Sequence, residues 1–180
     1  MVIGPEAGPF LFDTSAESWL ARTHVGAADE WLRRYLNHHR IAVSAITLAE
    51  RIRGYSLIWK TAAENERPAI EAMRLAYLSR PLQVFALDSA AAMIGGEIMA
   101  LLPTPPSPSR RSHRMVESRQ DRLARWRFDC LIAATALASR IPLLHNNAID
   151  FEAIRDGVAG ARGVVADYGP LRLVNCSLIA

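Results

Sequence analysis

The sequence predicts an α/β protein whose central parallel sheet is covered by helices on both faces. Short apolar runs, PFLFD, RIAVS, LQVFALD and IPLLH, alternate along the chain with segments of helical period. Runs without polar alternation are typical of strands buried on both faces, and intervening helices favour parallel pairing. At 180 residues the chain can build one well-cored domain, so we expect a single domain over residues 1–180.

Each apolar run is placed next to an expected helix. The helices are expected from about Ser15, from Ala45 to about Trp59, from Ser89 to Leu102, and around Asp129, directly before IPLLH. The late runs GVVADY and LRLVN could add an edge strand. The order of the strands in the sheet is left open by the sequence.

One segment, residues 103–127, interrupts this alternation with PTPPSPSRRSHRMVESRQDRLARWR. Its prolines and serines disfavour regular structure, so its first half is expected to be a loop. From about Arg114 it could form a helix with charged side chains on its solvent-facing sides. We interpret the segment as a Pro/Arg-rich insertion within the domain.

The composition argues against a membrane or secreted protein, and it does not by itself require a nucleic-acid partner. The net charge of +3 and the pI near 9.2 are too mild to demand a nucleic-acid partner. No apolar segment reaches the roughly 18 residues of a membrane span, and the opening residues do not resemble a secretory signal. Cys130 and Cys176 form no CxxC pair, which favours a reducing environment. We therefore expect a cytoplasmic protein without membrane contact.

Four carboxylates from distant segments are expected at one edge of the sheet. Asp13 ends the first strand, Asp150 follows IPLLH, and Glu50 lies about two turns into the helix after RIAVS. Asp129 is expected at the amino end of the helix that feeds the last major strand. Because ligands of parallel sheets bind at the carboxyl ends of the strands, these four side chains form the candidate site.

Each carboxylate also has a structural interpretation. Asp13 and Asp129 could cap helices, and Asp150 could cap a short helix, DFEAIRD. The T-x-x-E of residues 47–50 resembles a capping box, although Ser44 is the better helix cap.

Other polar residues give weaker signals. Asp88, in LDSAAA, has the context of a plain helix cap and is left outside the site. The five histidines lack ligand spacing such as HExxH, so an imidazole-based zinc site is not indicated. Gly95 and Gly96 are not followed by the lysine of a phosphate-binding loop, which favours a role in helix packing.

Three segments carry a resemblance to a known family. FLFDTSA, VSAITLAERIRG and FDCLIAATALASRIPLLHNNAIDF, in this order, resemble the PIN domain, most closely the VapC-type toxins of toxin–antitoxin pairs. The resemblance implies a three-layer α/β/α fold and a metal-dependent ribonuclease. It assigns the acidic quartet to Asp13, Glu50, Asp129 and Asp150, with Ser15 and Asn147 in support.

The resemblance also implies ligands and partners. The quartet would hold Mg²⁺ or Mn²⁺, hard cations that prefer oxygen ligands. RNA would be the substrate, and Arg51, Arg53 and the arginines of residues 110–127 could contact its backbone. A VapB-like antitoxin obstructing the acidic pocket and a homodimer are implied as well. Two alternatives remain: a PIN nuclease of RNA maturation, and a catalytically inactive PIN-like binding module.

The sequence departs from the family pattern in two places. His145 stands where the family usually has threonine, giving H-N-N-A-I-D-F, and could still donate a hydrogen bond to a carboxylate or a phosphate. The insertion at 103–127 is longer than the usual connection, and could affect the substrate, dimer contacts or antitoxin fit.

Overall fold

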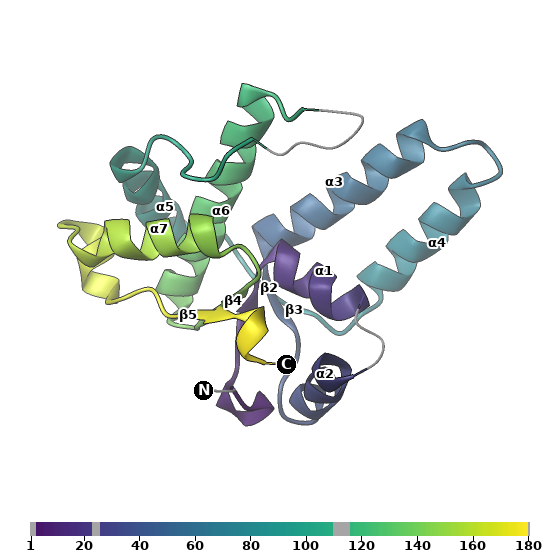
Figure 1. Cartoon of the computed structure of the whole chain (residues 1–180), viewed down its shortest axis with the longest axis horizontal. Helices are drawn as coiled ribbons and strands as arrows, with labels where there is room; N and C mark the ends of the chain where they lie inside the picture. The colour runs from purple at the N-terminus through teal and green to yellow at the C-terminus, as the bar shows by residue number, and fades with distance from the viewer. Residues whose placement is uncertain (1–2, 23–25, 110–115, 180) are drawn as a thin grey trace.

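A single parallel sheet forms the centre of the molecule (Figure 1). The computed structural model describes residues 3–22, 26–109 and 116–179. The strands follow the order β3-β2-β1-β4-β5 and are β1 Leu11–Phe12, β2 Ala42–Ser44, β3 Gln83–Phe85, β4 Leu143–His145 and β5 Leu173–Asn175. Every pairing is parallel, with Leu11 opposite both Ala42 and Leu143. The predicted parallel sheet is confirmed.

Seven α-helices connect and flank these strands in the described part of the chain. They are α1 Thr14–Arg22, α2 Ala27–His38, α3 Ala45–Thr61, α4 Arg67–Leu78, α5 Ser89–Leu101, α6 Arg119–Ser139 and α7 Ala148–Ala159. Short 3₁₀ segments lie at Pro5–Ala7, Val164–Tyr168 and Cys176–Leu178. Within the described ranges, no helix has the length and hydropathy of a membrane span.

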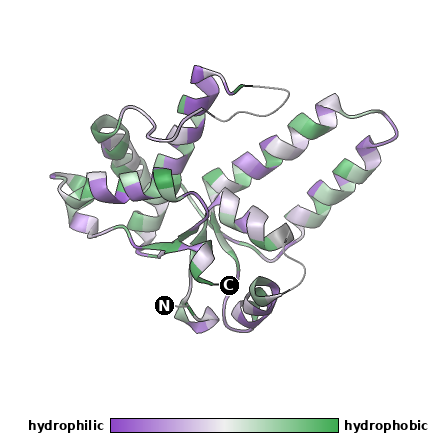
Figure 2. Cartoon of the chain, in the orientation of Figure 1, coloured by the Kyte–Doolittle hydropathy of each residue, from purple (hydrophilic) through white to green (hydrophobic). Residues whose placement is uncertain are grey.

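The sheet is sandwiched because successive strand residues enter opposite cores. Leu11 and Leu143 pack with side chains of α5, α6 and α7, whereas Phe12 and Leu144 pack with those of α1 and α2. In Figure 2 the inner strands are mostly hydrophobic. This arrangement confirms the three-layer α/β/α fold. The edge strand β3 differs from the expected strand buried on both faces, because Gln83 and Val84 are exposed. Helices α3 and α4 project from the sheet as a helical hairpin (Figure 1).

Helix starts follow the capping signals in the sequence. Ser44 caps α3 by accepting a hydrogen bond from Thr47 N at 2.9 Å, and Asp88 caps α5 by accepting from Ala91 N at 2.9 Å. Both assignments are confirmed. Since Thr47 lies inside α3, the T-x-x-E of residues 47–50 is not a capping box.

Helix α6 differs from the prediction. It begins at Arg119, after the Ser118 cap, so Asp129 lies near its middle rather than at its amino end. The arginine-rich segment carries apolar Leu123 and Trp126 at helical spacing, and they extend the buried stripe that continues at Cys130. Arg114, where a helix was expected to begin, lies outside the described residues, and residues 116–118 are not helical. Residues 103–109 form no helix or strand, as predicted.

Smaller elements complete the comparison with prediction. LRLVN supplies the edge strand β5, while GVVADY forms a 3₁₀ segment. Cys130 and Cys176 are buried free thiols. Gly95 lies at the close contact of α5 with α6, where an added Cβ would approach Leu131 Cδ2 to 2.7 Å, so it serves helix packing.

Candidate active site

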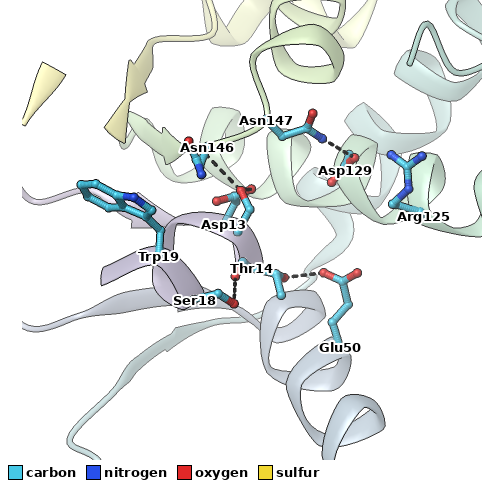
Figure 3. A pocket seen from close by; sticks show the side chains of 10 residues that line it. Asp13, Thr14, Ser18, Trp19, Glu50, Arg125, Asp129, Asn146 and Asn147 are labelled. Carbon is cyan, nitrogen blue, oxygen red and sulfur yellow. Dashed lines mark hydrogen bonds between the residues drawn. The ribbon is translucent and has the colours of Figure 1, made fainter. Parts of the chain in front are cut away.

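A cavity of about 630 Å³ opens where the carboxyl ends of the strands meet the surrounding helices (Figure 3). It is lined by Asp13, Thr14, Ser15, Ser18, Trp19, Glu50, Arg125, Asp129, Asn146 and Asn147. Three of the four predicted carboxylates therefore face one space, although they come from β1, α3 and α6. The sheet edge gathers them because β1 lies at its centre, directly beside β2 and β4.

Asp13 is held rigidly at the start of α1. Its Oδ1 accepts from Ala16 N at 2.6 Å and its Oδ2 from Ser15 Oγ at 2.7 Å. Ser15 Oγ also accepts from Asn146 N at 3.1 Å, which ties α1 to the end of β4. Asp13 thus caps α1 and lines the cavity at once, so the two interpretations of this residue are compatible.

Burial, and then the negative charge of Glu50, raise the pKa of Asp13 to about 6 in spite of the hydrogen bonds from Ser15 and Ala16. The pKa of Asp129 is raised well above its ordinary value by burial, and then by the charges of Asp13 and Asp150. The acidic side chains around the cavity are thus close enough for their charges to act on one another.

Glu50 and Asn147 are also fixed by contacts across the site. Thr14 Oγ1 donates a short hydrogen bond to Glu50 Oε2, which joins α1 to α3. Asn147 Nδ2 donates to Asp129 Oδ2 at 3.3 Å and to Asp150 Oδ2 at 2.8 Å. The predicted supporting residues, Ser15 and Asn147, therefore contact the carboxylates.

Asp150 lies next to this group in a different setting. It is fully buried and does not line the cavity. Its Oδ1 accepts from Ser107 N at 3.3 Å, and its Oδ2 accepts from Ser107 Oγ, Arg125 Nη1 and Asn147 Nδ2 at 3.1, 3.0 and 2.8 Å. Its assignment as a metal ligand stays a prediction.

The insertion contributes two residues to the site. Arg125 is one of the arginines of residues 110–127 that were expected to contact RNA, whereas Ser107 was not predicted. Arg125 lines the cavity, and its Nε and Nη2 donate to Glu117 at 3.0 and 3.1 Å while Nη1 reaches Asp150. A signal was present: Arg125 and Asp129 are four residues apart, which puts them on one helix face once α6 is continuous. Ser107, from the proline-rich loop, had no comparable signal.

Three other residues singled out in the sequence do not line the cavity. Arg51 Nε forms a salt bridge with Glu17 Oε2 at 2.7 Å, whereas Arg53 is exposed on α3. His145 is buried against Phe151 and does not line the cavity, and burial lowers its pKa to about 4. The histidine is therefore neutral at pH 7. The proposed RNA contacts of Arg51 and Arg53 stay predictions.

The donor set suits a hard divalent cation with few protein ligands. Among the residues described, no three acidic, histidine or cysteine side chains form a ready-made group for a metal ion. Mg²⁺, however, commonly keeps several waters and takes only one or two carboxylates together with substrate phosphate. Asp13 and Asp129, buried with raised pKa values along one cavity, fit that mode of binding.

Fold and cavity together define an α/β protein that gathers buried carboxylates at the carboxyl edge of a parallel sheet. The family profile described as PIN domain matches residues 10–156, and the chain belongs to the PIN domain family. The family resemblance inferred from the sequence is confirmed. A search of curated protein sequences finds no match.

Two solved structures share the fold. VapBC2 from Rickettsia felis, bound to a DNA fragment from their promoter, matches with a TM-score of 0.57 and 20% identity, over 92% of this chain and 97% of that chain. DNA-bound VapBC from Salmonella typhimurium matches with a TM-score of 0.57 and 23% identity, over 92% and 96%. At these identities the similarity establishes the fold.

Proposed function

We propose that the chain is a metal-dependent endoribonuclease. The observation that carries the proposal is the convergence of Asp13, Glu50 and Asp129, from three distant segments, on one cavity. Such a group repels a phosphodiester unless a cation intervenes. PIN domains are typically nucleases, so membership in that family supports the same reaction class.

Each carboxylate has a role in this proposal. Asp13 and Asp129 would hold the ion, Mg²⁺ or Mn²⁺, and Glu50, fixed by Thr14, would orient the attacking water. When bound, the ion would supply a Lewis acid that acidifies this water and offsets charge on the phosphate. The water oxygen gives up a proton to solvent and forms a bond to phosphorus, the bond to the leaving sugar oxygen breaks, and that oxygen takes up a proton from solvent. Asn147 keeps the carboxylate of Asp129 in place.

The wall of the cavity suits a nucleic acid in a second respect. Trp19 lies beside Asp13 and Asn146 along the cavity (Figure 3). An aromatic ring next to a cation-loaded site offers a stacking surface for a base without selecting its identity. We further propose that Arg53, exposed on α3 although it does not line the cavity, contacts the RNA backbone in a salt-sensitive manner.

A toxin role is the proposed biological context. The two structural relatives are VapBC complexes, which supports a VapB-like antitoxin as partner. A homodimer stays part of the proposal. Expression of the chain alone then arrests growth, and co-expression with the antitoxin relieves the arrest. Normal growth during expression of an active nuclease would favour RNA maturation instead.

The nuclease proposal is tested by RNA cleavage with Asp13→Asn, which keeps shape and removes charge. Cleavage by the wild type requires Mg²⁺ or Mn²⁺ and is lost in the variant. Asp156→Asn, at an exposed carboxylate paired with Arg155, is the matched control and retains activity. Cleavage by Asp13→Asn at the wild-type rate would refute the assignment.

A further inference from the structure

The insertion brings a cation of its own to the acidic site. Arg125 is 13% exposed, lines the cavity, and places Nη1 3.0 Å from Asp150 Oδ2. Figure 3 shows its guanidinium beside Asp129, on the side of the cavity away from Trp19. Asp150, fully buried, meets a permanent positive charge here.

The lone pairs of Asp150 are already engaged. Its Oδ2 accepts from three donors, Ser107 Oγ, Arg125 Nη1 and Asn147 Nδ2, and its Oδ1 accepts from Ser107 N. A carboxylate offers about four lone-pair sites, so this set leaves little capacity for a metal ion. A divalent cation at Asp150 would have to displace the guanidinium.

The space between Asp150 and Asp129 is likewise occupied by donors. Asn147 Nδ2 bridges Asp129 Oδ2 and Asp150 Oδ2, and the guanidinium of Arg125 lies beside both carboxylates. A second ion that bridges two carboxylates would need this position. N–H groups thus stand where a two-ion site would place its second cation.

Arg125 is held in this position by two further contacts. Glu117, eight residues earlier in the insertion, accepts from Nε and Nη2 at 3.0 and 3.1 Å. Ser107 Oγ accepts from Nη1 at 3.2 Å. All three nitrogens of the guanidinium therefore donate hydrogen bonds, which holds its plane in one orientation. The insertion supplies the cation and the residues that orient it.

We propose that Arg125 takes the place of a second metal ion, so that the site binds a single divalent cation at Asp13 and Asp129 and Asp150 is a positioning residue for Arg125. The inference rests on the proposed nuclease function and goes further by fixing the number of ions. It assigns a role to the insertion, whose contacts convert a quartet into three cavity-lining carboxylates and one neutralised carboxylate.

The test counts Mn²⁺ ions by calorimetry on the folded, RNA-free protein. The wild type binds one Mn²⁺ per chain, and Arg125→Met, which keeps length and removes charge, binds a second. Arg122→Met is the matched control, because Arg122 lies one turn earlier on α6 and donates to Pro105 O instead of Asp150. This control stays at one ion. Two ions in the wild type, or one ion in folded Arg125→Met, would overturn the inference.

A second variant keeps the inference testable if Arg125→Met fails to fold. Asp150→Asn keeps the count at one Mn²⁺ per chain if Asp150 only positions Arg125. If Asp150 is instead a ligand of a second ion, the wild type binds two Mn²⁺ per chain and this variant binds one. RNA cleavage by the wild type is assayed separately, so two bound ions in an active enzyme would refute the inference alone, whereas no cleavage would refute the proposed function.

Discussion

Asp13 and Glu17 lie one helical turn apart on α1, and both are almost completely buried, yet their surroundings differ. Glu17 accepts from Arg51 Nε at 2.7 Å and Tyr77 Oη at 3.4 Å, with Arg80 Nη1 at 3.7 Å. In the described chain, neither Asp13 nor Asp129 has a salt-bridge partner, and Asp13 accepts from the Ser15 hydroxyl and from the backbone N–H groups of Ser15 and Ala16.

The difference separates structural from functional carboxylates. A buried charge is expensive unless a cation accompanies it, and at Glu17 the chain supplies that cation by joining α1, α3 and α4. The carboxyl of Asp13 is left with a raised pKa beside an open cavity. Under the proposed function, the cation that Asp13 lacks is a divalent ion taken up from solvent. Asp150, paired with Arg125, resembles Glu17 more than it resembles Asp13.

The largest effect is expected for Asp129→Asn on catalysis. Removing one charge that holds the ion lowers the rate of RNA cleavage by about 100- to 1,000-fold, in line with the loss of one electrostatic group from an active site. Single-turnover cleavage at saturating Mn²⁺ measures it. A decrease below about 10-fold would place Asp129 outside the reacting centre.

Next in size is the stability loss for Arg51→Met at the structural carboxylate. Breaking a buried ion pair by removing one partner costs about 3 kcal/mol, because Glu17 keeps its charge. Urea denaturation at pH 7.5 measures the free energy of unfolding. Arg53→Met, two residues along α3 and exposed, is the control and changes this free energy little. Equal stability of both variants would remove the distinction between Glu17 and Asp13.

Asp13→Asn should have the opposite effect on stability. The pKa of Asp13 is about 6 in the folded protein and ordinarily 3.8, so the ionised carboxylate weakens folding increasingly from pH 4 to 6 and fully above it. The variant therefore gains up to about 3 kcal/mol of unfolding free energy at pH 7.5 and almost none at pH 3.5. Urea denaturation in EDTA at both pH values measures it. A gain independent of pH would contradict this origin.

The smallest effect is expected for Asn147→Ala. Asn147 contacts Asp129 and Asp150 without facing substrate chemistry directly, and loss of such an orienting residue lowers metal affinity or activity by about 10-fold. Mn²⁺ titration and cleavage kinetics should change together. A variant with unaltered Mn²⁺ affinity would show that the carboxylates are positioned without Asn147.

The sequence predicted most of what regular patterns encode. Unbroken apolar runs identified the strands, and Ser44 and Asp88 marked two helix starts correctly. The gathering of Asp13, Glu50 and Asp129 followed from the rule that parallel strands end at one edge. The strand order was left open because pairing between distant segments leaves no local signal.

The misplaced start of α6 and the contacts of Asp150 have one origin, the insertion. Its arginines suggested a solvated segment, yet Leu123 and Trp126 anchor it to the core and extend the helix. That extension brings Arg125 to Asp150. Contacts between side chains that are 25 residues apart depend on the three-dimensional path of the chain. The sequence analysis did not predict the burial of His145. Alternation along β4 turns this side chain toward Phe151 and the core.

The most direct measurement is Mn²⁺ binding at pH 7.5, followed by electron paramagnetic resonance of the free ion. The wild type should take up Mn²⁺, Asp13→Asn and Asp129→Asn should lose it, and Asp156→Asn should match the wild type. Undiminished uptake by Asp13→Asn and Asp129→Asn, or no uptake by the folded wild type, would contradict the claim that these buried carboxylates bind a divalent cation from solvent.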